Sequence, residues 1–316
     1  MTVNWADVRG RGWADPDLIR TRLAEGADPD TGAPQFGTFD GSPLHLAAQW
    51  GSPEVVAELI GRVADVDAMN DDRTALWVAV FHGHMDVARL LITAGADPWR
   101  PMMSGWAPGR LALAGPVPDL FPSPPDRQGL STAEMEAVAE SRRLIEVLAG
   151  IDLTGFGVTF ASAISSKEAI RRLDAALVPE ADMAAILDTS SEDQTVLGLT
   201  DVPGGCVLTQ PWGATPTWHE VIEPLCAGAT AYGVFVNPGS GSQGVVGVNG
   251  VIEDSDTHPG GGDAGGHLSA EEILAEYLYQ GQALAYCCAA AGLRPIDARA
   301  VTGPPDHWIR VHDIDF

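Results

Sequence analysis

Residues 42–48 read SPLHLAA, and residues 74–80, which lie 32 positions further along the chain, read TALWVAV. The same offset relates Gly51 to Gly83. A repeat period in this range is typical of stacked helical units, because each unit buries its apolar face only against its neighbours. The spacing therefore predicts a helical repeat array in the first half of the chain.

Weaker copies flank these two stretches. Residues 18–28 (LIRTRLAEGAD) match residues 87–97 (VARLLITAGAD) and indicate the second helix and exit turn of a degenerate first repeat. Residues 105–108 (GWAP) indicate the start of a fourth repeat, and residues 132–149 are predicted to form its outer helix. The stretch between them, residues 114–129, is a Pro-rich insertion that is incompatible with a helix. About four repeats result, which exceeds the roughly three that a stable array needs.

The stretch at residues 42–48 resembles an ankyrin repeat, whose inner helix opens with a Thr-Pro-Leu-His-like turn. The resemblance implies an all-α ankyrin-repeat solenoid over residues 1–150, with degenerate terminal repeats. It also implies a protein-binding role rather than catalysis. Two residues depart from the pattern: Trp77 replaces the histidine found at His45, and Trp106 replaces the Ser/Thr cap. We therefore expect an altered hydrogen-bond network in the third repeat.

The resemblance also implies where a partner binds, namely the β-turn fingers and the exposed face of the inner helices. The apolar and aromatic residues carried over to these positions would form an exposed stripe of the kind that interfaces favour. The alternative is that some of them pack against the C-terminal domain. The predicted partner-binding residues are Phe39, Gln49, Trp50, Asn70, Asp71, Arg73, Phe81, His82, Met102 and Met103.

The repeat stops after Gly150. Beyond it, segments rich in β-forming residues and bounded by Gly and Pro alternate with two helical segments. The helices open at capping boxes that begin at Ser165 and Ser269. The first is expected to run to about Leu177 and the second, without a break, to about Ala291. Residues 151–316 are therefore predicted to form an α+β domain with a mostly antiparallel sheet and the long helix on one face.

Parts of this second half resemble uncharacterised actinobacterial proteins. The resemblance lies in residues 205–213 (GCVLTQPWG) and 301–306 (VTGPPD), and a bias for Arg over Lys is consistent with a bacterial source of that kind. No chemistry is implied, so the function of residues 151–316 stays open.

The charge is strongly negative, at -25. No Lys or Arg lies between Arg172 and Arg294, which argues against nucleic acid and anionic membranes as partners because both need a positive surface. The acidity either keeps the protein in solution or attracts a basic partner. We expect a cytoplasmic protein, since no apolar run reaches the ~18 residues of a membrane span and residues 1–7 lack the features of a signal peptide. The oligomeric state is left open.

Candidate catalytic motifs are weak. Residues 239–244 match the dinucleotide pattern G-x-G-x-x-G, but a strand is predicted to follow where the pattern needs a helix, so a hairpin is favoured. The densest group of potential ligands lacks metal-ligand spacing, and the four cysteines form no C-x-x-C pair. We predict no catalytic residue, no metal and no cofactor. The residues of a candidate small-ligand loop are Trp212, Trp218, His219, Glu253, Asp254, Asp256, His258 and Asp263.

Two functional hypotheses follow. The first is a protein-interaction module that binds a protein partner through the ankyrin groove, with an immunity or antitoxin-like role, or a regulatory one. The second is that the C-terminal domain is an enzyme or a small-ligand or metal-binding domain, with the array as its targeting or regulatory part. The first is preferred because no catalytic spacing is convincing.

Overall fold

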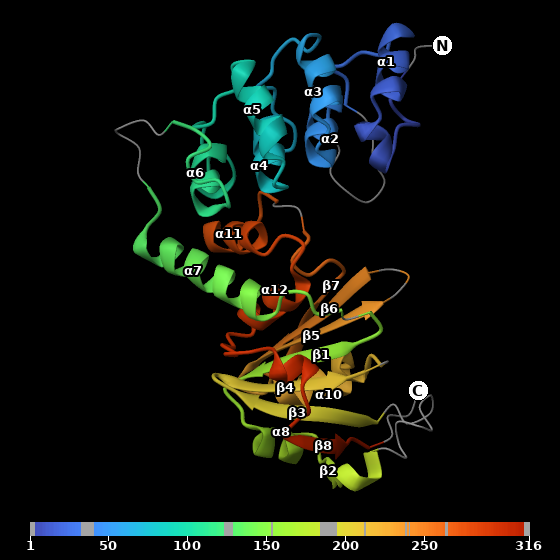
Figure 1. Cartoon of the computed structure of the whole chain (residues 1–316), viewed down its shortest axis with the longest axis vertical. Coiled ribbons are helices and arrows are strands. Elements are labelled where there is room, and N and C mark those ends of the chain that lie inside the picture. The colour runs from blue at the N-terminus through green and yellow to red at the C-terminus, as the bar shows by residue number, and fades with distance from the viewer. Residues whose placement is uncertain are drawn as a thin grey trace. The chain divides into compact units, whose positions relative to one another are not determined.

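The computed structural model describes residues 4–32, 41–122, 129–152, 154–183, 195–211, 213–237, 239, 241–262 and 265–312. The chain forms two compact units (Figure 1). The array unit contains Met1–Val138 and Asp263–Leu278, and the sheet unit contains Ala139–Gly262 and Tyr279–Phe316. The division therefore differs from two consecutive halves that meet at residue 150, because a later segment belongs with the repeats.

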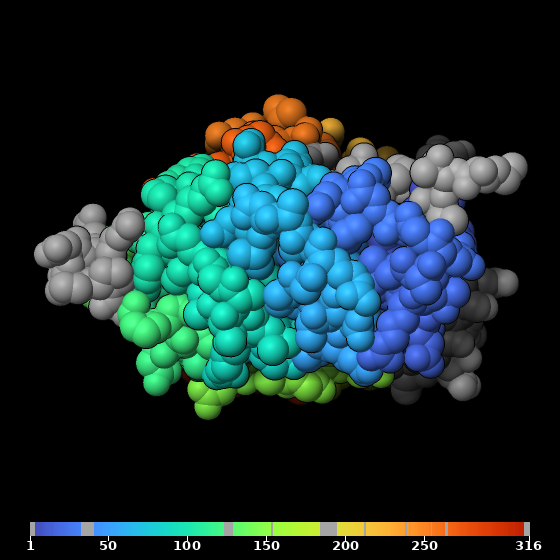
Figure 2. Space-filling view, turned by 90° about the horizontal axis from the view of Figure 1, so that it is seen from above, coloured from blue at the N-terminus to red at the C-terminus, as the bar shows by residue number. Residues whose placement is uncertain are grey.

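The array unit is built from short helices in antiparallel pairs. Inner helix α2 packs on outer helix α3, inner helix α4 packs on outer helix α5, and each inner helix packs on the next one along the array. Figure 2 shows the successive elements as neighbouring bands from blue to green. The bounds are η1 Gly10–Ala14, α1 Pro16–Ala24, α2 Pro43–Trp50, α3 Pro53–Ile60, α4 Ala75–Phe81, α5 Met85–Thr93, η2 Met103–Gly105, α6 Pro108–Ala114, α7 Thr132–Val147 and α11 Ala270–Leu278.

Local sequence explains where these helices begin. The Ser52 hydroxyl accepts a hydrogen bond from the Val55 amide at 3.3 Å, and the Thr74 hydroxyl accepts one from the Trp77 amide at 3.2 Å. Such caps satisfy amides that have no partner within the helix. A proline stands in the first turn of α1, α2, α3 and α6, where the lack of an N–H costs nothing.

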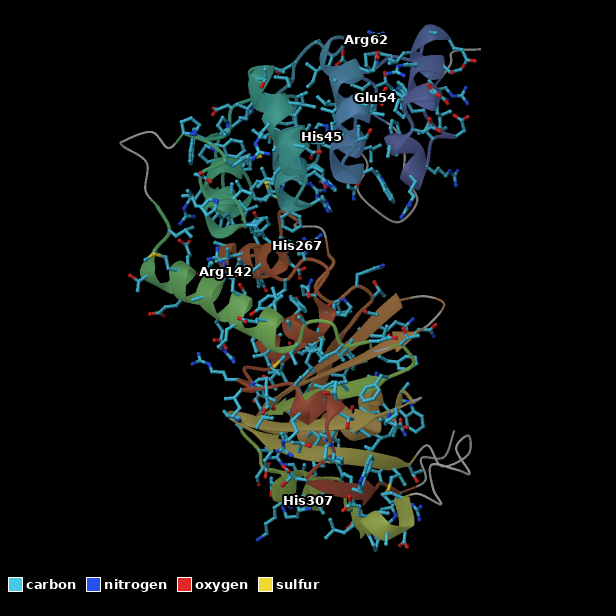
Figure 3. The ribbon with its side chains drawn as sticks, viewed as in Figure 1. His45, Glu54, Arg62, Arg142, His267 and His307 are labelled. Atoms are coloured by element: carbon cyan, nitrogen blue, oxygen red, sulfur yellow. The ribbon has the colours of Figure 1, made fainter. Side chains whose placement is uncertain are left out.

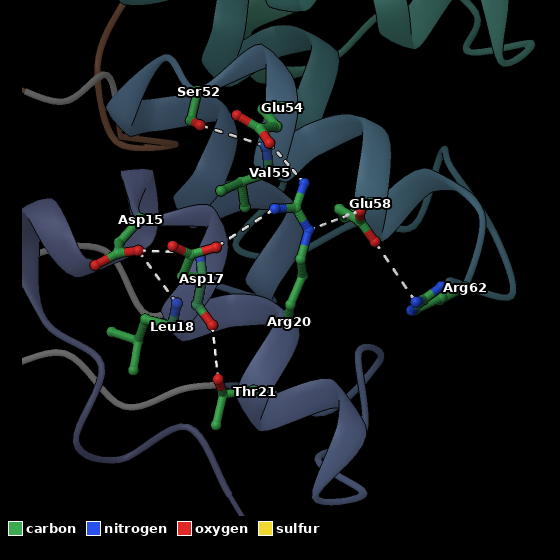
Figure 4. A network of polar contacts seen from close by, with 10 residues as sticks. All are labelled: Asp15, Asp17, Leu18, Arg20, Thr21, Ser52, Glu54, Val55, Glu58 and Arg62. Atoms are coloured by element: carbon green, nitrogen blue, oxygen red, sulfur yellow. Dashed lines mark hydrogen bonds and ion pairs between the residues drawn. The ribbon is translucent and has the colours of Figure 1, made fainter.

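Carboxylates link one repeat to the next. The Asp30 carboxylate accepts the Ala64 amide at 3.1 Å, and the Asp67 carboxylate accepts the Asp97 amide at the same distance. On the outer helices, Arg20 of α1 contacts Glu54 and Glu58 of α3 (Figure 4). The repeat offset in the sequence is thus matched by repeated contacts in the structure.

The N-terminal end of the array is closed by tryptophans. Trp5 and Trp13 are each at most 1% exposed, and their ring centroids lie 5.5 Å apart. The Trp5 indole N–H donates to the Asp28 carbonyl at 2.7 Å. The short η1 helix packs on α2 in the place of an inner helix. This explains how the degenerate first repeat still buries one end of the stack.

The fourth repeat is incomplete. Helix α6 packs on α4 as an inner helix should. Helix α7 begins with a capping box, in which the Ser131 amide donates to the Glu134 carboxylate and the Ser131 hydroxyl accepts from the Glu134 amide. However, α7 does not pair along α6 as α5 pairs along α4. The expectation that residues 132–149 form the outer helix of this repeat was wrong, although a helix is present there.

The described residues of the sheet unit form an eight-stranded sheet in the order β2-β8-β3-β4-β1-β5-β6-β7, and every neighbouring pair is antiparallel. The mostly antiparallel α+β fold is therefore confirmed. The strands are β1 Gly157–Ser162, β2 Ala176–Val178, β3 Val196–Val202, β4 Gly205–Gln210, β5 Thr230–Asn237, β6 Gly241–Val248, β7 Val251–Asp256 and β8 His307–Arg310. The helical elements are α8 Ser166–Arg172, η3 Thr215–Thr217, α10 His219–Leu225, α12 Ala283–Ala290 and α13 Arg299–Thr302.

Helices pack on both faces of this sheet. Alternate residues of β5 separate the two faces: Ala231 joins a buried cluster with Val221 and Ile222 of α10, whereas Tyr232 contacts Tyr286 of α12. Helix α12, which lies within the predicted long helix, packs on one face as expected, and α10 covers the other face.

Two boundaries also differ from expectation. The helix predicted from Ser269 to Ala291 is interrupted after Leu278, where Gly281 takes φ +72°, so that α11 and α12 are separate. The helix predicted to reach Leu177 ends at Arg172, and Leu177 lies on edge strand β2 with 63% of its surface exposed. Within the described residues, no helix is both long and apolar enough to cross a membrane.

Candidate protein-binding surface

The finger of the third repeat is a tight turn at residues 70–73. The Asn70 and Arg73 backbones bond to each other at 2.8 and 3.0 Å, and Asp71 and Asp72 take φ of +49° and +57°. Aspartate tolerates this left-handed backbone better than most residues. The Arg73 guanidinium donates to the Asp71 carboxylate at 2.7 Å, which leaves an acidic tip with both aspartates exposed.

His45 connects the second repeat to this finger. Its Nδ1 accepts from the Ser42 hydroxyl at 2.7 Å, and its Nε2 donates to the Arg73 carbonyl at 3.0 Å. Burial lowers the pKa of His45 to about 4, so the ring is neutral at pH 7. Figure 3 labels His45 on α2. The neutral ring fixes the start of α2 relative to the finger that follows it.

The third repeat has an aromatic core in place of this network. Trp77 is 1% exposed and stacks on Phe81 of the same helix with centroids 6.3 Å apart. The start of α4 is held by the Thr74 cap, whose hydroxyl accepts from the Trp77 amide. The expected change in the third repeat, where Trp77 replaces the histidine, is therefore a change from hydrogen bonding to packing.

The predicted binding residues fall into distinct groups. Trp50 is exposed (40%), as is Asp71, and the half-buried residues are Gln49, Asn70, His82 and Met102. Arg73, Phe81 and Met103 are buried, so the exposed apolar stripe expected along the groove is not present at Phe81 and Met103. Phe39 lies outside the described residues.

Helix α11 accounts for the burial of Phe81. Tyr277 of α11 contacts the Phe81 ring with centroids 6.0 Å apart, and Ile273 and Leu274 join the buried core of the array. A later segment of the chain therefore occupies part of the predicted surface. The capping box at Ser269 and Glu272 signals this helix in the sequence, but an apolar face does not indicate which surface it covers.

The candidate small-ligand loop is not assembled as one site. Trp218 packs with the α10 side of the sheet, and His219 opens α10. Asp256 lies on the opposite side, where it accepts the Tyr232 hydroxyl at 2.7 Å and the His258 amide at 2.8 Å. Glu253 and Asp254 lie on β7. Trp212 and Asp263 are outside the described residues.

The other chemical candidates are structural. All four cysteines are buried, and burial raises the pKa of both the Cys206 and the Cys288 thiol to about 12. Asn237 at the end of β5 pairs with Gly241 at the start of β6, so a strand follows the glycine motif where a dinucleotide site needs a helix. In the part of the chain that the structure describes, no three His, Cys, Asp or Glu residues are placed to hold a metal ion.

Comparison with known proteins supports the array. Residues 11–102 match the family model of ankyrin repeats in three copies. A putative ankyrin repeat-containing protein of Treponema pallidum is 51% identical over 61 residues, or 18% of this chain and 20% of that protein. A rice zinc finger CCCH domain-containing protein is 32% identical over 153 residues, or 43% of this chain and 22% of that protein. The chain thus spans about a fifth of the length of each of these relatives, and residues 11–102 are ankyrin repeats.

Proposed function

We propose that the ankyrin array binds a protein partner through the part of its inner-helix and finger surface that α11 leaves accessible. Ankyrin repeats generally mediate protein–protein interaction. The observation that carries the proposal is Trp50, an indole that is 40% exposed at the end of an inner helix, whereas Trp5, Trp13, Trp77 and Trp106 are buried. Exposed aromatics of this kind are frequent anchors in interfaces.

Charge indicates the character of the partner. The finger presents Asp71 and Asp72, and the chain as a whole carries a charge of -25. An acidic surface accelerates association with a basic protein and disfavours an acidic one. A basic partner, such as the target of an immunity or antitoxin-like protein, fits this surface best.

Affinity capture from the native host, followed by mass spectrometry, tests the proposal. The wild-type chain is compared with Trp50→Ala, with Asp71→Asn and with a control, Leu177→Ala, which removes an even more exposed apolar side chain from β2. We expect one specific partner to be lost with Trp50→Ala, weakened with Asp71→Asn and retained with the control. Undiminished capture of every partner by both array variants would refute the proposal.

A further inference from the structure

The segment that carries α11 begins and ends at two glycines that are hydrogen-bonded to each other. The amide of Gly281 donates to the carbonyl of Gly260 at 2.6 Å, and both glycines have left-handed φ angles, +72° and +64°. We call residues 261–280 the arm. Its ends are held together, while the part of it from Asp263 to Leu278, which includes α11, belongs to the array unit.

The arm docks on the array through apolar side chains and two backbone carbonyls. Ile273 is fully buried and Leu274 is 4% exposed, both in the core that contains α4 and α6. The Trp106 indole donates to the Ala270 carbonyl at 2.9 Å, and the Ser104 hydroxyl donates to the Leu268 carbonyl at 2.6 Å. This is how an amphipathic helix binds a groove, with anchors at i, i+1 and i+4.

One polar group is left unsatisfied where α11 docks. The Tyr277 hydroxyl is buried and has no hydrogen-bond partner among the described residues. It lies so close to Gly115 that a Cβ atom there would be 2.1 Å from the oxygen. A buried hydroxyl without a partner costs about 1–3 kcal/mol, so α11 binds less tightly than its apolar contacts alone would allow.

The arm is acidic, as is the chain as a whole. Helix α11 carries Glu271, Glu272 and Glu276 on a chain that is already strongly acidic. A helix with the same apolar anchors and an aromatic without a hydroxyl in place of Tyr277 would avoid the cost of the buried hydroxyl. Basic residues on its outer face would add attraction to the acidic chain.

We propose that α4, η2 and α6 form a helix-binding site that α11 occupies in cis, and that a basic amphipathic helix of a protein partner binds there by displacing α11. This proposal rests on the protein-binding function of the array and adds a second site to it. The arm then acts as a competitor whose tethering gives it a high effective concentration, so that weak helices are excluded.

Hydrogen exchange on the intact wild-type chain tests whether α11 is releasable. We expect the amides of α11 to exchange at least about tenfold faster than those of α2 and α4, through local opening. Protection of α11 equal to that of α2 and α4 would mean that it opens only with the whole array, and the proposal would fail.

A labelled peptide with the sequence of residues 267–280 tests the site itself. The full chain with Leu274→Asp, whose arm should leave the groove, is expected to bind this probe at least about tenfold more tightly than wild type does. Tyr277→Ala serves as a second, milder variant, and Leu177→Ala on the exposed edge strand β2 is the control that should match wild type. Circular dichroism confirms that each variant is folded.

A peptide carrying Glu271→Lys then tests the charge of the partner helix. We expect it to bind the Leu274→Asp chain about two- to threefold more tightly than the original probe at low salt, with the difference lost at high salt. Equal probe binding by wild type and both folded arm variants would overturn the helix-binding site. Because no partner protein is used, this outcome is independent of the capture experiment with Trp50→Ala.

Discussion

The second and third repeats share a backbone pattern but differ in the chemistry of their inner helices. In α2 the buried residue after the turn is His45, and a hydrogen-bonded ring connects it to the next finger. In α4 the equivalent residue is Trp77, which stacks on Phe81. The comparison shows that the same position supports hydrogen bonding to the next finger in one repeat and aromatic packing in the following repeat.

The strongest test of this difference compares two tryptophans. Trp77→Ala removes a side chain that is 1% exposed and should lower the free energy of unfolding of the array by about 3–5 kcal/mol, because a large cavity forms. Trp50→Ala, at 40% exposure, should cost about 1 kcal/mol or less. Urea denaturation followed by circular dichroism measures both. Equal losses would contradict the assignment of Trp77 to the core.

The second test uses pH, since only the second repeat contains the buried histidine. The folded pKa of His45, about 4, lies below its ordinary value of 6.5, so the unfolded chain binds the proton more tightly between these values. The array should therefore lose about 3 kcal/mol of stability as pH falls from 6.5 to 4. The same titration of His45→Gln should lack this component. An unchanged pH dependence in the variant would exclude His45 as its source.

A third test concerns the helix that covers the third repeat. Gly115→Ala places a methyl group against the Tyr277 hydroxyl and should destabilise the array by about 1–3 kcal/mol, whereas Gly129→Ala meets no atom within 4 Å and serves as its control. Tyr277→Phe should be neutral or stabilising by up to about 1 kcal/mol, because it removes an unpaired buried hydroxyl. In the double variant, Tyr277→Phe should recover part of the loss. Additive effects in thermal denaturation would show that the two residues do not meet.

The smallest effect is expected where the outer helices of the first and second repeats meet. Arg20→Gln removes the exposed contacts to Glu54 and Glu58 (Figure 4). Surface ion pairs of this kind contribute little and are screened by salt. The midpoint of thermal denaturation should fall by less than in any variant above, and the difference from wild type should vanish at high salt. A difference that persists at high salt would indicate packing by the Arg20 side chain instead.

Much of the array could be predicted from local sequence. The offset between residues 42–48 and 74–80 locates helices α2 and α4, and the capping boxes at Ser131, Ser165 and Ser269 mark the starts of three more helices. These signals are local because capping and repeat packing involve residues that are close in sequence or one repeat apart.

The burial of Phe81 could not be predicted in the same way. Its contact with Tyr277 joins residues far apart in the chain, and an apolar helix face shows only that some surface covers it. The break after Leu278 did have a local signal in Gly281, since glycine commonly ends a helix, but the apolar pattern of residues 283–291 continued past it. Net charge and composition did not indicate which residues form a site, because neither property depends on where a residue lies in the fold.

The late position of α11 in the sequence also affects how the array folds during synthesis. Ribosomes release the chain from its N-terminus, and α6 ends at Ala114 whereas α11 ends at Leu278. At about 5–20 residues per second, roughly 10 to 30 s pass between the synthesis of these two helices. During that interval Phe81 and Trp106 have no α11 to cover them, so the nascent array presents an aromatic surface to chaperones until its last helix arrives.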